Sequence, residues 1–228
     1  MQVAALIAAS GEGQRMGGET KKQYLLLDGV PILARTLKIF ESCQAVGQIV
    51  VVVPPGDINF ARDLIKPFCS LEKSIFVEGG NRRQDSVYLG LQAVSPEVEI
   101  VCIHDGVRPF VSNELIENVL QAAIRWGAAV PVIPETDTLK EISISGMICR
   151  TISRETVRRV QTPQMFRRNL IVEAYRKSQL LGVEATDDAY LLELLGENIC
   201  AVAGSPANIK ITHPLDLLFA EAILKGGQ

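Results

Sequence analysis

Residues 3–18 read VAALIAASGEGQRMGG, an apolar run that passes directly into a loop with four glycines. A strand that is apolar on both faces is typical of a parallel sheet covered by helices on both sides. A glycine-rich loop at the end of such a strand is where many α/β proteins bind phosphate groups. The beginning of the chain therefore predicts an α/β fold with an anion site after the first strand.

Strand-like and helix-like stretches alternate along most of the remaining chain. Further strands are expected at Gln48–Val53, Ser74–Val77, Glu99–Ile103, Ala128–Ile133 and Ile199–Val202. Amphipathic helical patterns lie between them. Pro31 and Pro214 are expected in first helical turns, Asn81 is expected as an N-cap, and Leu217 and Leu218 are expected on the inner face of the last helix. This alternation predicts one domain, residues 1–228, with a doubly wound sheet flanked by helices.

One segment departs from this pattern. Residues Thr138 to Ile152 alternate apolar and polar side chains around the turn dipeptide Ser145-Gly146, which predicts a β-hairpin. A two-stranded ribbon is marginally stable by itself, so its apolar side should pack against another surface. That surface is either a second copy of the chain or the chain's own domain, and the sequence leaves both open.

Composition and charge exclude several classes of protein. The chain is 47% hydrophobic and 21% charged, as in ordinary globular proteins, and its net charge of −3 argues against a nucleic-acid surface. The apolar runs are shorter than the roughly 18 residues of a membrane span, and the N-terminus lacks the basic start of a signal peptide. Five cysteines at scattered positions favour neither a disulfide framework nor a zinc site. We expect a cytoplasmic protein that binds neither membranes nor nucleic acids.

The first glycine-rich loop carries positive charge. It lacks the G-x-x-x-x-G-K-[ST] pattern of the Walker A motif. It also misses the dinucleotide fingerprint, because its third glycine arrives one residue late, and this disfavours an NAD-dependent oxidoreductase. Gly11 and Gly13 allow backbone amides to approach an anion closely, while Arg15 and Lys22 add cations nearby. If this loop were the only evidence, a flexible solvated basic loop would be the favoured interpretation.

A second glycine pair strengthens the case for an anion. Gly79-Gly80 follows the third strand, and Arg82 and Arg83 come directly after it, in what should be a first helical turn. Cations at this end oppose the helix dipole, which is explained if the turn meets a phosphate or another negative group. Arg82 could equally be a tolerated surface charge. Arg83 and Ser86 share one helical face, so they are candidate contacts.

The fourth strand ends in further polar residues. Asp105 and Arg108 follow its carboxyl end, where open α/β sheets bind ligands. Asp105 is a candidate Mg²⁺ ligand, although a turn or capping role is equally open. His104 has no partner at ligand spacing, which favours a structural role. Later segments add hydroxyls and cations suited to a second, phosphorylated substrate: Thr138, Arg154, Thr162, Thr186 and Lys210.

In this order and spacing, the motifs resemble the 2-C-methyl-D-erythritol 4-phosphate cytidylyltransferase family. The resemblance runs from about Ala4 to Glu221 and rests on these segments: residues 8–16, 22–24, 79–86, 104–109, 137–140, 161–164, 186–188 and 208–212. It implies a Rossmann-like nucleotidyltransferase fold with a mostly parallel twisted sheet. It also implies a homodimer joined by an arm at 138–152, and a requirement for Mg²⁺ or another divalent cation.

The resemblance further implies the reaction of CTP with 2-C-methyl-D-erythritol 4-phosphate, giving 4-diphosphocytidyl-2-C-methyl-D-erythritol and pyrophosphate. A cytidylyltransferase for another alditol phosphate, such as ribitol 5-phosphate, is the nearest alternative. A nucleotide-binding regulator without activity would lack the cations at the α-phosphate, and Arg15 and Lys22 are both present.

Site residues also follow from the resemblance. Arg15 and Lys22 would stabilise the transition state, and Arg154 and Lys210 would position the attacking phosphate. The residues expected to hold CTP are Ala8, Ala9, Ser10, Gly11, Gly13, Gly80, Arg83 and Ser86. Those expected at the alcohol-phosphate pocket are Asp105, Arg108, Thr138, Thr162 and Thr186, with Thr138 and Arg154 reaching in from the partner subunit. The chain departs from the family pattern at Ser10 and Val107, where alanine is common, and at Lys21, where proline is common.

Overall fold

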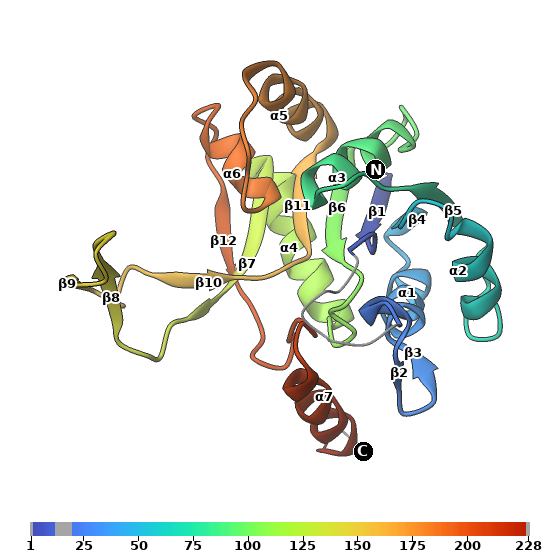
Figure 1. Cartoon of the computed structure of the whole chain (residues 1–228). Coiled ribbons are helices and arrows are strands. Elements are labelled where there is room, and N and C mark those ends of the chain that lie inside the picture. The colour runs from blue at the N-terminus through green and yellow to red at the C-terminus, as the bar shows by residue number, and fades with distance from the viewer. Residues whose placement is uncertain (1, 12–19, 227–228) are drawn as a thin grey trace.

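A twisted eight-stranded sheet forms the centre of the molecule (Figure 1). The computed structural model describes residues 2–11 and 20–226. The strand order is β10-β7-β11-β6-β1-β4-β5, with β12 also pairing with β7. The strands of this sheet are β1 (Val3–Ala8), β4 (Val46–Val53), β5 (Ser74–Glu78), β6 (Ile100–Asp105), β7 (Ala128–Pro134), β10 (Arg158–Val160), β11 (Gln164–Arg167) and β12 (Cys200–Ala203).

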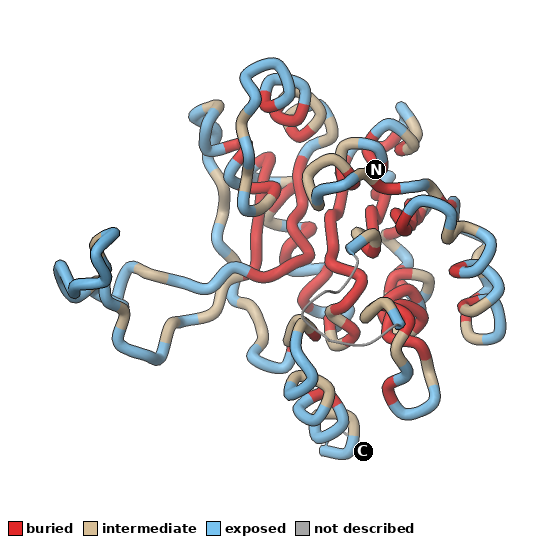
Figure 2. The backbone as a smooth tube through the Cα atoms, in the orientation of Figure 1, coloured by how far each residue is buried: buried red, intermediate tan, exposed pale blue. Residues whose placement is uncertain are grey.

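Helices cover both faces of the sheet, as the doubly wound prediction requires. The helices are α1 (Ile32–Ser42), α2 (Ile58–Ile65), α3 (Arg83–Gln92), α4 (Asn113–Trp126), α5 (Arg168–Leu181), α6 (Asp188–Glu193) and α7 (Pro214–Gly226). Alternate residues of β1 point to opposite faces: Ala5 and Ile7 join a core with α1, α2 and α4, and Ala4 and Leu6 join a core with α3, α5 and α6. Figure 2 shows the resulting buried centre.

All the predicted strands are present, but the sheet also contains strands that the pattern did not predict. β1 pairs in parallel with β4 and β6, and β4 pairs in parallel with β5. β11 lies between β6 and β7 and runs antiparallel to both, and β10 runs antiparallel to β7. These two strands are only three and four residues long, too short for a clear alternation. The sheet is therefore mostly parallel with an antiparallel insertion.

The predicted hairpin is present and projects from the domain (Figures 1 and 2). β8 (Leu139–Ile142) and β9 (Ile148–Ile152) form their own antiparallel sheet, and Gly146 takes a φ of 82° in the turn, which glycine adopts without strain. Ile142, Ile144 and Ile148 are exposed. The alternative in which the hairpin packs onto its own domain is wrong. We call residues 138–152 the arm.

Two helix predictions need correction. The N-cap of α3 is Arg82 rather than Asn81, because the Asp85 carboxylate accepts a hydrogen bond from the Arg82 backbone N–H at 3.3 Å. In α7, Leu218 is exposed rather than on the inner face. The helical period instead turns Leu217 and Ala220 toward the small core that includes Val107 and Ile211. Within the described residues, no helix combines the length and the apolar character needed to cross a membrane.

Candidate active site

A cavity of about 770 Å³ opens at the carboxyl ends of the parallel strands. The register of the sheet brings Ala8, at the end of β1, beside Val52 of β4 and Asp105 of β6. The cavity lining includes these predicted site residues: Ala8, Ala9, Ser10, Gly11, Lys22, Gly80, Arg83, Asp105 and Lys210. Segments far apart in sequence, from Ala8 to Lys210, therefore meet at the edge of the sheet where α/β folds bind ligands.

The two glycine-rich loops are joined by a hydrogen-bonded pair of serines. The Ser10 hydroxyl donates to Ser86 Oγ at 2.6 Å, and the Gly80 N–H donates to the same oxygen at 3.1 Å. The Ser86 hydroxyl donates to the carbonyl of Arg82 at 2.9 Å. A Cβ atom at Gly79 would lie only 2.5 Å from Ser10 Cβ, so only glycine allows this approach. Ser86 therefore lies behind the cavity wall and holds the loops together.

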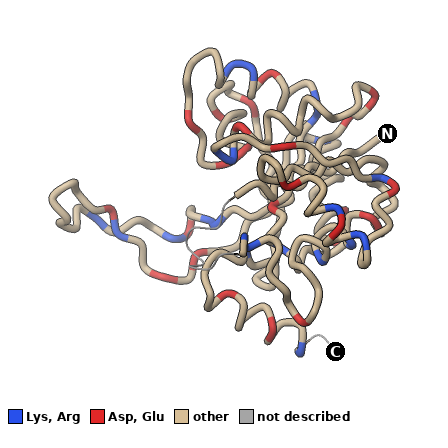
Figure 3. Tube along the Cα trace, turned by 45° about the vertical axis from the view of Figure 1, so that its right-hand side comes forward, with Lys and Arg blue, Asp and Glu red and all other residues tan. Residues whose placement is uncertain are grey.

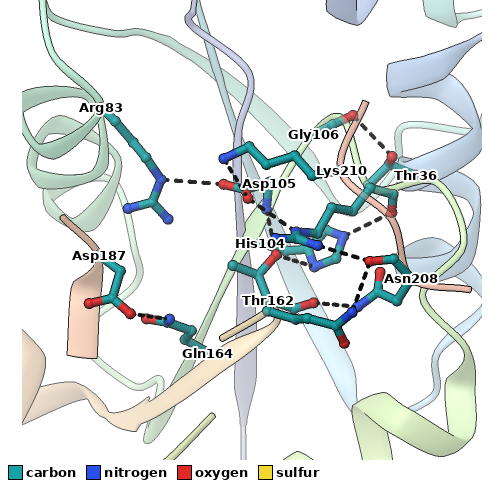
Figure 4. Close-up of polar contacts among 12 residues, drawn as sticks. Thr36, Arg83, His104, Asp105, Gly106, Thr162, Gln164, Asp187, Asn208 and Lys210 are labelled. Atoms are coloured by element: carbon teal, nitrogen blue, oxygen red, sulfur yellow. Dashed lines mark hydrogen bonds and ion pairs between the residues drawn. The ribbon is translucent and has the colours of Figure 1, made fainter. Parts of the chain in front are cut away.

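Asp105 gathers three cations around one buried carboxylate (Figure 4). Lys210 Nζ lies 3.0 Å from Oδ2, Arg108 Nε lies 3.2 Å from Oδ2, and Arg83 Nε lies 3.3 Å from Oδ1. Burial raises the pKa of Asp105, but the three cations outweigh it and hold the pKa well below its ordinary value. Asp105 is therefore ionised, and it fixes Lys210 at the cavity.

The same geometry bears on the expectation that Asp105 binds a metal ion. Both of its oxygens face nitrogen cations, so Mg²⁺ would have to displace or approach three positive charges. Among the described residues, no group of three or more His, Cys, Asp or Glu side chains is placed to hold a metal ion. The role of Asp105 as a metal ligand therefore stays a prediction.

The cations at the start of α3 have carboxylate partners of their own. Arg83 Nη1 and Nη2 donate to the fully buried Asp188 at 3.1 and 2.7 Å, and Arg82 Nη2 donates to Asp85 at 2.8 Å. Burial lowers the pKa of Arg83, yet Asp188 and Asp105 raise it well above its ordinary value, so the guanidinium stays charged. These carboxylates are negative groups of the kind that the sequence allowed as an alternative to a ligand phosphate. Arg83 also lines the cavity.

A buried polar network supports Asp105 from behind. Thr162 Oγ1 accepts the Asp105 backbone N–H at 3.1 Å and lies 3.1 Å from His104 Nδ1, while Asn208 Nδ2 donates to the Thr162 carbonyl at 2.8 Å. Arg108 Nη1 donates to the Asn208 carbonyl at 2.8 Å. The network ties the end of β6 to the segment that carries Lys210. It also agrees with the structural role expected for His104.

Several predicted site residues lie away from this cavity within the protomer. Thr162 and Arg108 belong to the network behind it, and Thr186 is exposed beside the start of α6. Thr138 is exposed at the base of the arm, and Arg154 Nη1 donates to the carbonyl of Thr136 at 2.8 Å just beyond it. Figure 3 shows Lys and Arg positions along the arm. Gly13 and Arg15 lie outside the described residues.

The cavity also has lining residues that were not predicted as site residues. Pro54 and Pro55 follow β4. Gln23 directly follows Lys22, and Thr212 comes two residues after Lys210. The position of the two prolines after a predicted strand was the available signal, since ligands gather at that edge of the sheet.

Comparison with known proteins is consistent with this site. The sequence model of the 2-C-methyl-D-erythritol 4-phosphate cytidylyltransferase family matches residues 3–226. The protein of that name from Pelotomaculum thermopropionicum is 47% identical over 228 residues, covering 100% of this chain and 96% of that protein. The crystal structure of 4-diphosphocytidyl-2C-methyl-D-erythritol synthase from Anaerococcus prevotii has a TM-score of 0.87 and 32% identity, covering 98% of this chain and 96% of that one.

The crystal structure of the cytidylyltransferase from Thermus thermophilus is also similar, with a TM-score of 0.81 and 39% identity over 99% of this chain and 100% of that one. Both the sequence and the fold are matched along nearly the full length. The chain belongs to the 2-C-methyl-D-erythritol 4-phosphate cytidylyltransferase family.

Proposed function

We propose that this cavity transfers a cytidylyl group from CTP to 2-C-methyl-D-erythritol 4-phosphate, releasing pyrophosphate and forming 4-diphosphocytidyl-2-C-methyl-D-erythritol. Membership of the family supports the reaction. The observation that carries the assignment to this cavity is the convergence of Lys22 and Lys210 with the glycine-rich backbone of Gly11 and Gly80 on one cavity. That cavity offers amides and cations to the phosphate groups of two substrates.

The chemistry needs cations more than it needs a base. A phosphate monoester has a second pKa near 6, so the attacking phosphate is already mostly a dianion at neutral pH. Its oxygen forms the new bond to the α-phosphorus of CTP as the bond to pyrophosphate breaks. The obstacle is repulsion between two anions, and catalysis consists of positioning and charge stabilisation. His104, buried behind the cavity, has no part in this proton balance.

Each cation has a role that follows from its place. Lys22, beside the Gly11 loop, stabilises charge at the α-phosphate, and Arg15 is proposed to act with it. Lys210, held by Asp105, positions the attacking phosphate. The backbone of residues 8–11 and Gly80 holds the nucleotide. A divalent cation is proposed as part of the metal–CTP substrate, where Mg²⁺ typically uses phosphate oxygens and water as ligands.

The acceptor and the role of Lys22 can be tested together. Pyrophosphate release from CTP is measured with 2-C-methyl-D-erythritol 4-phosphate, with ribitol 5-phosphate and without acceptor. We expect release only with the first acceptor, and efficient use of ribitol 5-phosphate instead would overturn the choice of acceptor. Replacing Lys22 by alanine should lower turnover by roughly 10²–10³, as loss of one transition-state donor does. Unchanged turnover would remove Lys22 from the mechanism.

We also propose that the protein is a homodimer in which the arm completes the partner's site. The exposed apolar residues Ile144, Met147 and Ile148 favour an interface on the arm. Thr138 and Arg154 lie at the arm and not in their own cavity, which is consistent with a role in the partner's phosphate pocket. A cytoplasmic location is likewise proposed, supported by five free cysteines.

Mixed dimers test the contribution of the arm. Arg154→Ala alone should raise the KM for the alcohol phosphate, and a defect only toward CTP would contradict its role. Lys22→Ala and Arg154→Ala chains are mixed, allowed to exchange and assayed at an alcohol phosphate concentration too low for either variant to turn over. Each heterodimer then has one site with both native residues. Random exchange should restore about a quarter of wild-type activity. No recovery in a mixture shown to contain heterodimers would mean that Arg154 acts within its own chain.

A further inference from the structure

Beside the cavity, a single carboxylate holds the segment that carries Lys22. Asp57 directly precedes α2, and its N–H donates to the carbonyl of Pro54 at 3.1 Å, which closes a turn at the cavity wall. Asp57 Oδ2 accepts a hydrogen bond from Lys21 Nζ at 2.7 Å and another from the Tyr24 hydroxyl at 3.0 Å. Through one carboxylate oxygen, Asp57 therefore holds both Lys21 and Tyr24, on either side of Lys22, at the start of α2. We call Lys21, Tyr24 and Asp57 the clamp.

The clamp is shielded from solvent and is anchored at both ends. Lys21 and Asp57 have side-chain exposures of 33% and 18%, so their ion pair is screened less than a surface pair. Tyr24 is buried, and its ring packs edge-on against Phe60 of α2 with centroids 5.1 Å apart. Burial, then the hydrogen bond to Asp57, raise the pKa of Tyr24, so its hydroxyl remains a donor.

A tight turn links the clamp to the cavity. Lys22–Tyr24 forms the 3₁₀ turn η2, in which the Tyr24 N–H donates to the Lys21 carbonyl at 2.9 Å. Lys22 lines the cavity within this turn, and a Cβ added to Gly11 would lie 3.9 Å from Lys22 Cε. A shift of the turn would therefore move Lys22 along the glycine-rich loop.

Lys21 also shows how this chain holds the turn. Its backbone φ is −60° and its ψ is 135°, and a proline ring would fix φ near this value. A lysine has no such restriction, so the ion pair with Asp57 supplies the constraint from the side chain. Backbone stiffness and the ion pair are two ways to fix the same position.

From this geometry we infer that Asp57 is a positioning residue for cytidylyl transfer, which fixes Lys22 at the α-phosphate through Lys21 and Tyr24. The inference rests on the proposed role of Lys22. Asp57 stabilises the turn and touches no reacting atom, so its removal should change the rate more than substrate binding. A misplacement of about 1 Å costs about 10² in rate, so we expect Asp57→Ala to lower kcat by about 10- to 100-fold while each KM changes less than about threefold.

A double-mutant cycle tests this path of action. Values of kcat and KM for both substrates are measured for Asp57→Ala, Lys22→Ala and the double variant, with thermal unfolding to confirm folding. If Asp57 acts through Lys22, the double variant is no slower than Lys22→Ala alone. Asp63→Ala removes a carboxylate from an exposed position on the same helix and should retain wild-type kcat. Wild-type kcat in Asp57→Ala, or additive losses in the double variant, would overturn the inference.

Substitutions at Lys21 give a second and independent measurement. Lys21→Met removes the ion pair and should lower kcat, whereas Lys21→Pro restores the fixed φ and should retain more of it. An equal fall of kcat in Lys21→Met and Lys21→Pro would show that stiffness of the turn does not determine kcat. Where Asp57→Ala does not fold, the cycle of Lys21→Met with Lys22→Ala makes the same test. Full activity in Lys22→Ala would refute the proposed function of Lys22, whereas a slow Lys22→Ala with unaffected clamp variants would refute only the positioning role.

Discussion

Acidification from pH 7 to pH 5 should destabilise the protein through one buried histidine, His104. The side chain is fully buried, and its Nε2 lies 3.1 Å from the carbonyl of Arg108, which can only accept. Nε2 therefore carries the proton, and Nδ1 accepts from the Thr162 hydroxyl. A second proton would place an N–H against Thr162 Oγ1, which already accepts the Asp105 N–H. Neutral His104 is thus built into the network behind the cavity.

The size of the effect follows from the pKa. Burial lowers the pKa of His104 to about 4, whereas an unfolded histidine titrates near 6.5. Because the folded pKa is the lower one, the contribution to stability is complete above the unfolded pKa and is lost as the pH falls toward 4. One pKa unit corresponds to about 1.4 kcal/mol, so the loss between pH 7 and pH 5 is about 2 kcal/mol. The pKa of Asp105 is also depressed in the folded protein. Its contribution to stability is lost only near and below the ordinary pKa of an aspartate, which lies outside the range from pH 7 to pH 5.

Urea unfolding at pH 7, 6 and 5 measures this loss directly, with the wild type and His104→Gln compared at one protein concentration. The variant should be less stable at pH 7, because the bond to Thr162 is lost, but its free energy of unfolding should fall less with pH. His213, the other histidine of the chain, is exposed, so His213→Gln should follow the wild type. Parallel pH dependences for the wild type and His104→Gln would refute the reasoning.

Two further substitutions test the packing around the cavity. Asp188→Ala removes the nearer carboxylate of Arg83 and leaves Asp105 at 3.3 Å, so the free energy of unfolding in urea should fall by about 3 kcal/mol. A fall below about 1 kcal/mol would contradict a structural role for the Arg83–Asp188 pair. Gly79→Ala places a Cβ 2.5 Å from Ser10 Cβ and should weaken CTP binding, as measured by calorimetry. Gly47→Ala is the matched control, because nothing lies within 4 Å of its added Cβ. Equal affinities for CTP in the two variants would count against close packing of the loops.

Much of the fold could be predicted because its signals are local. The apolar strand Val3–Ala8 and the turn at Gly146 show their conformations in neighbouring residues, and both predictions were confirmed. β11 was missed because four residues wedged between two longer strands carry too little pattern to distinguish strand from loop. Asp188 was not predicted as the partner of Arg83 for a related reason, since the two residues lie far apart along the chain.

Motif order in the sequence was enough to determine the family and the doubly wound architecture, because strand periodicity, glycine pairs and cation positions are properties of short segments. The tertiary structure alone decided that Lys210 meets Asp105, that Ser10 meets Ser86, and that Arg154 lies outside its own cavity. Such contacts depend on strand order and register, which bring together residues separated by many tens of positions, and no local pattern records which distant segments become neighbours.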